Sequence, residues 1–356
     1  MTGPEDSLGI LRRTSGPLQQ EFDAALLDLD GVVYRGPQAV PHAADAIEGA
    51  CGSGMAMMFV TNNASRSPDD VAQRLTTLAI PTTPEQIVTS AQAAASLIAH
   101  QGEATTRVLA IGSDALRAAL IAAGLTVVTS ADEAPTVVVQ GMHPSLSWRD
   151  LAEAVYAINA GADHIATNLD ASVPTDRGVV LANGAMVAAV THATGRVPRD
   201  AGKPEPWIFH QAARRSGARH PLVVGDRLSG DIAGARAAGY AGLHVLTGVD
   251  GPADLLCARP PDRPHYLGLD LRALAETHPA PTQGENGWWT CRDAVASIHE
   301  GTVRLRRAGA DHDLGDGGRL SLDELRAACG AAWSASDAAG VPTVLVRPAA
   351  GLSVSG

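Results

Sequence analysis

The segment Ala24-Ala25-Leu26-Leu27-Asp28-Leu29-Asp30-Gly31 decides the fold of this chain. Its first four residues are apolar and a glycine follows closely, which is typical of a buried strand of a parallel sheet. In open α/β sheets, ligands bind at the carboxyl ends of strands, where Asp28 and Asp30 stand. Because positions i and i+2 share a face, we expect both carboxylates to face one pocket. Two neighbouring carboxylates repel each other, so a divalent metal and a phosphate group are predicted there.

Length and charge limit the classes of protein to which the chain can belong. Its 356 residues suggest two or three domains, and a net charge of -11 without a basic stripe argues against a nucleic-acid partner. The four cysteines form no CxxC pair, so we expect reduced thiols in a cytoplasmic protein. Residues 1–20 lack the apolar segment of a secretory signal, and no stretch approaches transmembrane length. We therefore expect a soluble protein without membrane insertion.

Polar residues also follow two further predicted strands. Residues 55–60 read as a buried strand that ends in Thr61-Asn62-Asn63, whose hydroxyl and amide groups suit phosphoryl oxygens. Residues 221–224 read as a third strand, followed by Asp226 and Asp231, which can reach one cation. A plain polar loop would also explain the Thr-Asn-Asn tripeptide, and a helix-capping role would also explain Asp231. Asp226 has no such simple structural explanation, because a carboxylate at a strand end needs a partner.

Lys203 is the only lysine among the 27 basic residues. Arginine replaces lysine freely on a solvated surface, so a retained lysine indicates a place that requires a compact ammonium group. It stands in Ala201-Gly202-Lys203-Pro204-Glu205-Pro206, before a predicted helix at residues 207–215. Chance survival of one lysine is the alternative explanation. A phosphate bound nearby would favour a point charge of this kind.

The order and wording of these strings resemble the haloacid dehalogenase (HAD) superfamily of phosphatases. The four matching strings are Asp28-Leu29-Asp30-Gly31-Val32, Thr61-Asn62-Asn63, Gly202-Lys203-Pro204 and Gly225-Asp226-Arg227-Leu228-Ser229-Gly230-Asp231. The resemblance covers about residues 20–280, and agreement of all four by chance is remote. The family more often carries threonine at the position of Gly230. We expect the loss of that hydroxyl to be tolerated.

The spacing of the strings predicts an inserted domain. Residues 64–202 separate Asn63 from Lys203, far more than a core crossover needs, and they carry their own βα pattern. This resembles subfamily IIA, which implies an α/β fold with a Rossmann-like parallel core and a large α/β cap of the C2 type. We predict a flexible segment at 1–20, the core at 21–103 and 194–280, the cap at 104–193, and a small C-terminal α/β accessory module at 281–356.

The resemblance implies a mechanism. Asp28 would attack phosphorus and form an aspartyl-phosphate, while Asp30 would protonate the leaving alcohol and then activate water. Mg²⁺ would be held by Asp28, the backbone carbonyl of Asp30, and Asp226, with Asp231 orienting a metal-bound water. The transferring phosphoryl group would be held by Thr61, Asn62, Asn63 and Lys203. Dehalogenase members lack an acid two residues after the nucleophile, so Asp30 favours phosphate esters.

The cap implies a small phosphorylated metabolite as substrate, because it excludes water and bulky molecules. Glycerol 3-phosphate is the preferred prediction, with 2-phosphoglycolate or pyridoxal phosphate as alternatives and a regulatory or binding protein on the same scaffold as a distant one. The residues nominated for specificity are Asn168, Asp170 and Thr175, for which ordinary loop polarity is the competing explanation. Trp148 and Tyr156 lie at helical spacing and are predicted to be core, which argues against a platform for an aromatic ring.

Residues 281–356 lie beyond the family pattern. We predict a helix at 321–339 and a final apolar strand-like run at 343–346. Trp288-Trp289 would anchor this segment or mark a contact in a homo-oligomer. The acids Asp311, Asp313 and Asp316 do not have EF-hand spacing, so a solvated turn is preferred over a calcium loop. The segment lacks the glycine-rich pyrophosphate loop of an acyltransferase and is assigned no catalysis.

Overall fold

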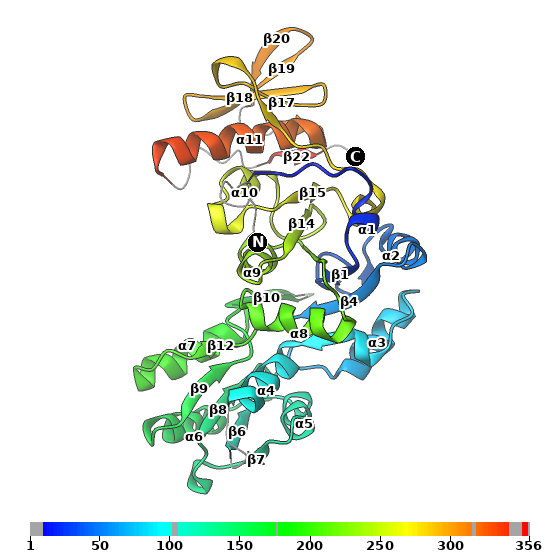
Figure 1. Ribbon diagram of the computed structural model, residues 1–356. Coiled ribbons are helices and arrows are strands. Elements are labelled where there is room, and N and C mark those ends of the chain that lie inside the picture. Colours follow the sequence, from blue (N-terminus) through cyan, green and yellow to red (C-terminus); the bar gives the residue numbers. More distant parts are fainter. Residues whose placement is uncertain (1–9, 102–105, 176, 315–317, 342–350, 355–356) are drawn as a thin grey trace. The chain divides into compact units, whose positions relative to one another are not determined.

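A computed structural model of the 356-residue chain describes residues 10–101, 106–175, 177–314, 318–341 and 351–354. The chain divides into two compact units (Figure 1). The first unit comprises Met1–Met57 and Ala218–Gly356, and the second unit comprises Met58–Gly217. Parallel strands form the centre of each unit.

The first unit contains four parallel strands in the order β15-β14-β13-β1. They are β1 (Ala24–Leu27), β13 (Pro221–Gly225), β14 (Ala241–Val245) and β15 (Tyr266–Gly268). All residues of β1 and β13 are buried, as expected for apolar strands of a sheet that is covered on both faces. The accompanying helices are α1 (Leu18–Glu21), α2 (Ala43–Gly52), a π-helical turn (Leu228–Ile232), α9 (Ala233–Ala237) and α10 (Pro252–Leu256). The strands predicted from the two acidic strings are confirmed.

The described part of the N-terminal segment is held against this sheet. Leu11 is buried, and the Arg12 and Thr14 N–H groups donate to the carbonyl oxygens of His265 and His278 at 2.8 and 3.0 Å. The flexibility expected for residues 1–20 stays a prediction. Residues 1–9 of that range lie outside the described part of the chain.

The C-terminal module also belongs to the first unit. It is an antiparallel sheet in the order β16-β17-β18-β19-β20 with one long helix packed against it (Figure 1). The strands are β16 (Thr282–Gln283), β17 (Trp289–Cys291), β18 (Ala294–His299), β19 (Thr302–Arg307) and β20 (Ala310–Asp313), and the helix is α11 (Leu322–Ala339). Ser321 caps α11 in a capping box with Glu324, so the predicted helix is confirmed. A short pair, β21 (Arg319–Leu320) and β22 (Ser353–Val354), completes it, and the run at 343–346 lies outside the described residues.

Two sequence expectations for this module can be compared with its structure. Trp289 is buried and its ring lies against Gly330 of α11, so it anchors the sheet to the helix, while Arg306 lies 4.0 Å over the ring of Trp288. The two described acids are exposed, as expected, but the prediction that they lie in a turn is wrong. Asp311 and Asp313 lie in strand β20 and pair with Arg306 and Arg304 of β19 at 2.8 and 2.6 Å. The cross-strand register brings these opposite charges together.

The second unit begins within β4 (Ala56–Thr61), which is parallel to β5 (Ile87–Thr89). It contains a five-stranded parallel sheet in the order β12-β9-β8-β6-β7. These strands are β6 (Arg107–Ile111), β7 (Thr126–Val128), β8 (Val137–Gln140), β9 (Asp163–Ala166) and β12 (Arg199–Asp200). The helices are α3 (Pro68–Thr77), α4 (Ser90–Gln101), α5 (Asp114–Ala122), α6 (Trp148–Asn159), α7 (Asn183–Thr194) and α8 (Pro206–Ser216), and a hairpin joins β10 (Ser172–Thr175) to β11 (Gly178–Leu181).

The prediction that Trp148 and Tyr156 belong to the core is wrong. Their exposed fractions are 80% and 60%, whereas α6 buries Ala154, Ala157 and Ile158 against the sheet. The spacing correctly places the two aromatic side chains on one face of a helix, but it cannot say which face meets the sheet. The face of α6 that meets the sheet carries Ala154, Ala157 and Ile158, so the two aromatic side chains lie outside the core.

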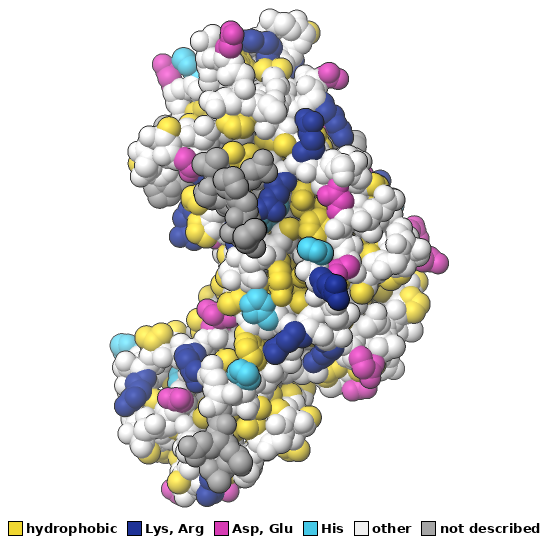
Figure 2. Space-filling view, viewed as in Figure 1, with side chains coloured by type: hydrophobic (Ala, Val, Ile, Leu, Met, Phe, Trp, Pro, Cys, Tyr) yellow, Lys and Arg dark blue, Asp and Glu magenta, His cyan; other side chains and the backbone are white. Residues whose placement is uncertain are grey.

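The exposed surface is of mixed character. On the face shown in Figure 2, basic and acidic side chains are interspersed. Among the described residues, none of the helices combines the length and the apolar character that spanning a bilayer requires.

Candidate active site

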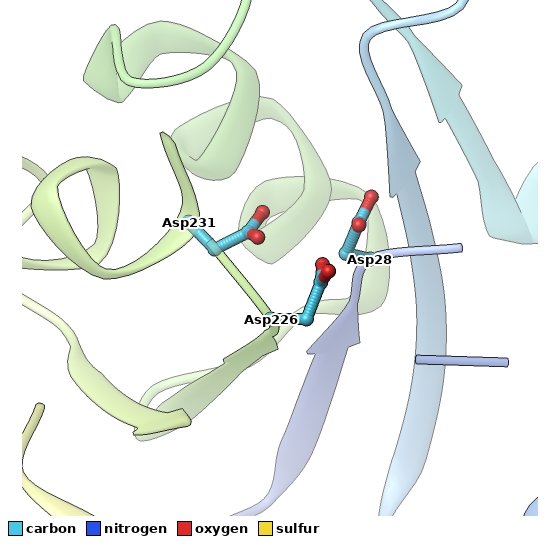
Figure 3. A group of neighbouring side chains, drawn as sticks. All are labelled: Asp28, Asp226 and Asp231. Carbon is cyan, nitrogen blue, oxygen red and sulfur yellow. The ribbon is translucent and has the colours of Figure 1, made fainter. Parts of the chain in front are cut away.

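Three carboxylates gather at the carboxyl ends of β1 and β13 in the first unit. Asp28 follows β1, Asp226 follows the neighbouring β13, and Asp231 lies in the π-helical turn that comes next. Their exposed fractions are 8%, 0% and 1%. One oxygen of each lies within 4.8 Å of the others, with the three side chains pointing toward a common centre (Figure 3). Parallel pairing of β1 with β13 therefore joins two acidic strings that are far apart in the sequence.

Glycines make this close approach possible. A Cβ at Gly31 or Gly248 would collide with the Asp226 carboxylate, and one at Gly225 would collide with the side chain of Asp231. Gly31 also has a φ of 89°, in the region that favours glycine. Glycine is thus required at position 31 for two reasons: the backbone turns there with a positive φ, and a side chain would occupy the space of the Asp226 carboxylate.

Backbone N–H groups orient two of the three carboxylates. The Val249 N–H donates to Asp226 Oδ2 at 2.7 Å, and the Arg227 N–H donates to Asp231 Oδ2 at 3.1 Å. Buried carboxylates this close to one another repel strongly when ionised. A set of hard oxygen donors fixed by backbone groups suits Mg²⁺, which binds through a few carboxylates and keeps several waters. The donor set of this site therefore fits a bound Mg²⁺ ion.

The side chain of Asp30 lies outside this group of three and is exposed. Its position is fixed by the backbone, because Asp30 and Tyr34 form a bridge and the Gly31 N–H donates to the Tyr34 oxygen at 2.8 Å. The structure thus separates the two acids of the first string, with Asp28 buried among the carboxylates and the Asp30 side chain turned to solvent.

In the second unit, Asn62 joins the end of β4 to the backbone of Lys203. Thr61 ends β4 and is buried, and Lys203 is 8% exposed. The Lys203 N–H donates to Asn62 Oδ1 at 2.8 Å, while Asn62 Nδ2 donates back to the Lys203 oxygen at 3.2 Å. Lys203 Nζ donates to the Val60 oxygen at 3.3 Å. The Asn62 side chain thus fixes the backbone of the lone lysine beside the end of β4.

The nominated specificity residues divide into two groups. Asn168 Nδ2 donates to the Asn62 oxygen at 2.7 Å, and Asp170 Oδ2 accepts from Asn62 Nδ2 at 3.3 Å. Thr175 is exposed, and its hydroxyl closes the β10–β11 hairpin by donating to the Gly178 oxygen at 2.7 Å. Asn168 and Asp170 therefore join the Asn62 cluster, whereas Thr175 has a local role in the turn.

Asn63 takes a different direction from Asn62. Its Oδ1 accepts from the Ser65 N–H at 2.8 Å, and its own N–H donates to Thr61 Oγ1 at 3.1 Å. These bonds shape the loop between β4 and α3. The side chain of Asn63 is thus engaged within its own loop.

Two acids that the sequence reasoning missed border these clusters. Asp250 Oδ2 accepts from the Leu228 N–H at 2.6 Å, and the Asp250 N–H donates to the Asp226 oxygen at 3.1 Å. Its position just beyond the carboxyl end of β14 was the available signal. In the second unit, burial raises the pKa of Asp200 to about 7, and the charges of Glu205 and Asp170 contribute. Its place three residues before the only lysine of the sequence was the available indication of Asp200.

Comparison with known proteins assigns the chain to a family. Residues 25–126 match a model described as haloacid dehalogenase-like hydrolase, and residues 200–274 match a HAD-hydrolase-like model. The D-glycerol 3-phosphate phosphatase of Mycobacterium tuberculosis is 47% identical over 72% of this chain and 72% of its own length. An acid sugar phosphatase of Staphylococcus aureus is 35% identical over 72% of this chain and 98% of its own.

Solved structures agree with this assignment. A crystal structure of glycerol phosphate phosphatase from M. tuberculosis in complex with magnesium has a TM-score of 0.79 and 40% identity, covering 96% of this chain and 95% of that one. A nitrophenylphosphatase from Geobacillus stearothermophilus has a TM-score of 0.65 and 33% identity, covering 71% and 98%. The chain therefore belongs to the haloacid dehalogenase-like hydrolases. The predicted resemblance and α/β fold are confirmed, and each of these relatives is named as a phosphatase.

Proposed function

We propose that the chain is a Mg²⁺-dependent phosphoric monoester hydrolase that converts glycerol 3-phosphate to glycerol and phosphate. The observation that carries the proposal is the group of three buried carboxylates, Asp28, Asp226 and Asp231, at the ends of two paired strands. Such a group is costly without a cation, and a divalent metal beside an Asp nucleophile is suited to phosphoryl transfer. The match to phosphatases over 72% of the chain supports the same activity.

The reaction proceeds in two displacements. A carboxylate oxygen of Asp28 forms a bond to phosphorus as the bond to the ester oxygen breaks, and Asp30 gives its proton to the departing alcohol. Asp30 then takes a proton from water, whose oxygen attacks phosphorus and releases phosphate and free Asp28. Bound Mg²⁺ supplies positive charge that offsets the carboxylates and the transferring phosphoryl oxygens. Its holders are Asp28, Asp226, Asp231 and the backbone carbonyl of Asp30.

Thr61, Asn62, Asn63 and Lys203 hold the phosphoryl group in this proposal. The contacts that support this role are those of Asn62, which donates to the Lys203 oxygen and accepts from the Lys203 N–H. Positioning by such groups accounts for much of the rate of phosphoryl transfer. Asn168 and Asp170 carry substrate specificity through the same asparagine. Thr175 is the least supported of the three specificity residues, because its hydroxyl serves the hairpin.

Glycerol 3-phosphate is preferred over the alternatives because the relative of that name is 47% identical, against 35% for the acid sugar phosphatase. The test is a panel of glycerol 3-phosphate, 2-phosphoglycolate, pyridoxal phosphate, a sugar phosphate and nitrophenyl phosphate, ranked by kcat/KM with and without Mg²⁺. We expect glycerol 3-phosphate to rank first. A higher kcat/KM for an aromatic ester would contradict this substrate.

The nucleophile has a separate test. Asp28→Asn should abolish release of phosphate from every ester of the panel, because an amide cannot form the aspartyl-phosphate. Asp114→Asn is the matched control, since that side chain is fully exposed in a surface pair with Arg117. Phosphatase activity that survives in Asp28→Asn would refute the mechanism.

The remaining proposals concern the location of the enzyme, its partner, its oligomeric state and the bounds of its cap. We propose a cytoplasmic location from the sequence, a small phosphorylated metabolite as the partner, and a homo-oligomer that light scattering would detect. We also propose a cap at 104–193 within the second unit. Expression of that segment alone and measurement of its unfolding would test the boundary.

A further inference from the structure

The C-terminal module shares an apolar core with the π-helical turn that carries Asp231. Matches to the two family models end at residue 274, so this module lies beyond the fold that these models describe, although the glycerol phosphate phosphatase structure from M. tuberculosis covers 96% of the chain. Yet its helix α11 packs directly against α10 in the first unit (Figure 1). One buried cluster includes Leu228 and Ile232 from the π-helical turn, Leu255 and Leu256 from α10, and Leu325, Cys329 and Trp333 from α11. Leu228 and Ile232 flank Asp231 in the sequence, so this core reaches the acidic site.

Polar contacts fix α11 to the core at three points. Trp333 Nε1 donates to the Leu255 oxygen of α10 at 2.8 Å. Arg263, which is 1% exposed, donates through both Nη atoms to the Asp337 carboxylate at 2.8 Å each. Arg326 Nη2 donates to the Leu267 oxygen of β15 at 2.6 Å. Buried bonds of this kind set one position for a helix, because shifting it would leave donors without acceptors.

From α10, the contacts continue to the carboxylates. The loop that enters α10 carries Asp250, whose carboxylate accepts from the Leu228 N–H at 2.6 Å. The Asp250 N–H donates to the Asp226 oxygen, and the neighbouring Val249 N–H donates to the Asp226 carboxylate. One continuous path of hydrogen bonds and packed side chains therefore runs from Trp333 through α10 to Asp226 and to the turn of Asp231.

We propose that the C-terminal module positions the metal-binding carboxylates, with Trp333 as the positioning residue that couples α11 to the Asp250 loop. The module touches neither substrate nor metal in this proposal. It narrows the range of positions open to Asp226 and Asp231, so the free protein already holds the geometry that the cation requires. The metal in this inference rests on the proposed function, whereas the coupling itself rests only on the contacts of the first unit.

The test uses Trp333→Phe in the full chain. This variant keeps an aromatic ring in the core but removes the N–H donor to Leu255. Calorimetric titration of the resting protein with Mg²⁺ should give a Kd about two- to fivefold higher than the natural chain, which is the effect of part of one hydrogen bond. Amide hydrogen exchange without metal should accelerate in residues 226–232 and 249–256. Trp333→Ala should enlarge both effects.

The matched control is Trp288→Phe, the same substitution on a tryptophan of the same module that lies under Arg306 rather than against α10. It should change neither the Kd for Mg²⁺ nor exchange at the two segments. A purely supporting role for α11 predicts a lower Tm in Trp333→Phe with unchanged Kd and unchanged exchange, and that outcome overturns the inference. If the natural chain binds no Mg²⁺, the proposed function fails, and the hydrogen-exchange result alone still decides the coupling.

Discussion

Replacement of Asp226 by asparagine should make the metal-free protein more stable and remove its stabilisation by Mg²⁺. Asp226 is fully buried, and its carboxylate lies within 4.8 Å of carboxylate oxygens of Asp28 and Asp231. At an effective dielectric constant of about 20, each pair of unit charges at that distance repels by about 3 to 4 kcal/mol. The amide oxygen of the variant still accepts from the Val249 N–H, so the backbone bond is kept. The variant therefore removes two repulsive pairs at little structural cost.

The measurable gain is smaller than the sum of both pairs. The effective dielectric constant varies with position in a protein, so we expect Asp226→Asn to gain only about 1 to 3 kcal/mol without metal. For a unit of this size, each kcal/mol moves Tm by about 2 to 4 °C. In the natural chain, Mg²⁺ at a hundred times its Kd should add about 2.7 kcal/mol, and the variant should lose this response.

Thermal unfolding followed by circular dichroism, in EDTA and at a series of Mg²⁺ concentrations, measures both quantities. Asp114→Asn removes a fully exposed carboxylate and should leave both unchanged. The reasoning would be refuted if Asp226→Asn unfolded at a lower temperature in EDTA and kept the full upward shift of Tm with Mg²⁺. That outcome would mean that the three acids do not share a cation.

Two further experiments test other features of the structure. Burial raises the pKa of Asp200 to about 7 in the folded chain, so this group lowers the free energy of unfolding as pH rises from about 4, near its pKa in the unfolded chain, to about 7. In urea unfolding, Asp200→Asn should therefore be more stable than the natural chain at pH 8 and gain little at pH 4.5. An equal gain at both pH values would contradict the burial of the Asp200 charge. Because Trp148 and Tyr156 are largely exposed, replacing both by serine should change the free energy of unfolding by less than about 0.5 kcal/mol per residue, and a loss of several kcal/mol would mean that they are buried.

The acidic site could be predicted because its rules are local. A short apolar run followed by Asp28, and another followed by Asp226, indicate two parallel strands whose ends carry ligands. Parallel pairing then brings the two ends together without any knowledge of the intervening residues. Lys203 could also be predicted, because a single lysine among 26 arginines is conspicuous in the composition, and the structure places it in contact with Asn62 and Val60.

Other features could not be predicted, because they depend on which surfaces meet. Helical spacing grouped Trp148 with Tyr156, but Ala154, Ala157 and Ile158 are the residues of α6 that lie in the core. Thr175 stood among polar loop residues, and only the hairpin showed that its hydroxyl closes a turn. The packing of α11 against α10 could not be predicted either. Trp333 donates to the Leu255 oxygen from a distant segment of the chain, and no local pattern indicates that these two residues meet.

The last strand of the C-terminal sheet has a consequence for self-association. Among the residues that the structure describes, strand β20 pairs with β19 alone, so its other edge offers peptide groups to which another chain could add. All four of its residues are exposed, and its two aspartates are bound to arginines of β19. Charged side chains along such a border oppose the stacking of sheets from separate molecules into fibrils. A natural assembly of this enzyme should therefore leave this border exposed to water.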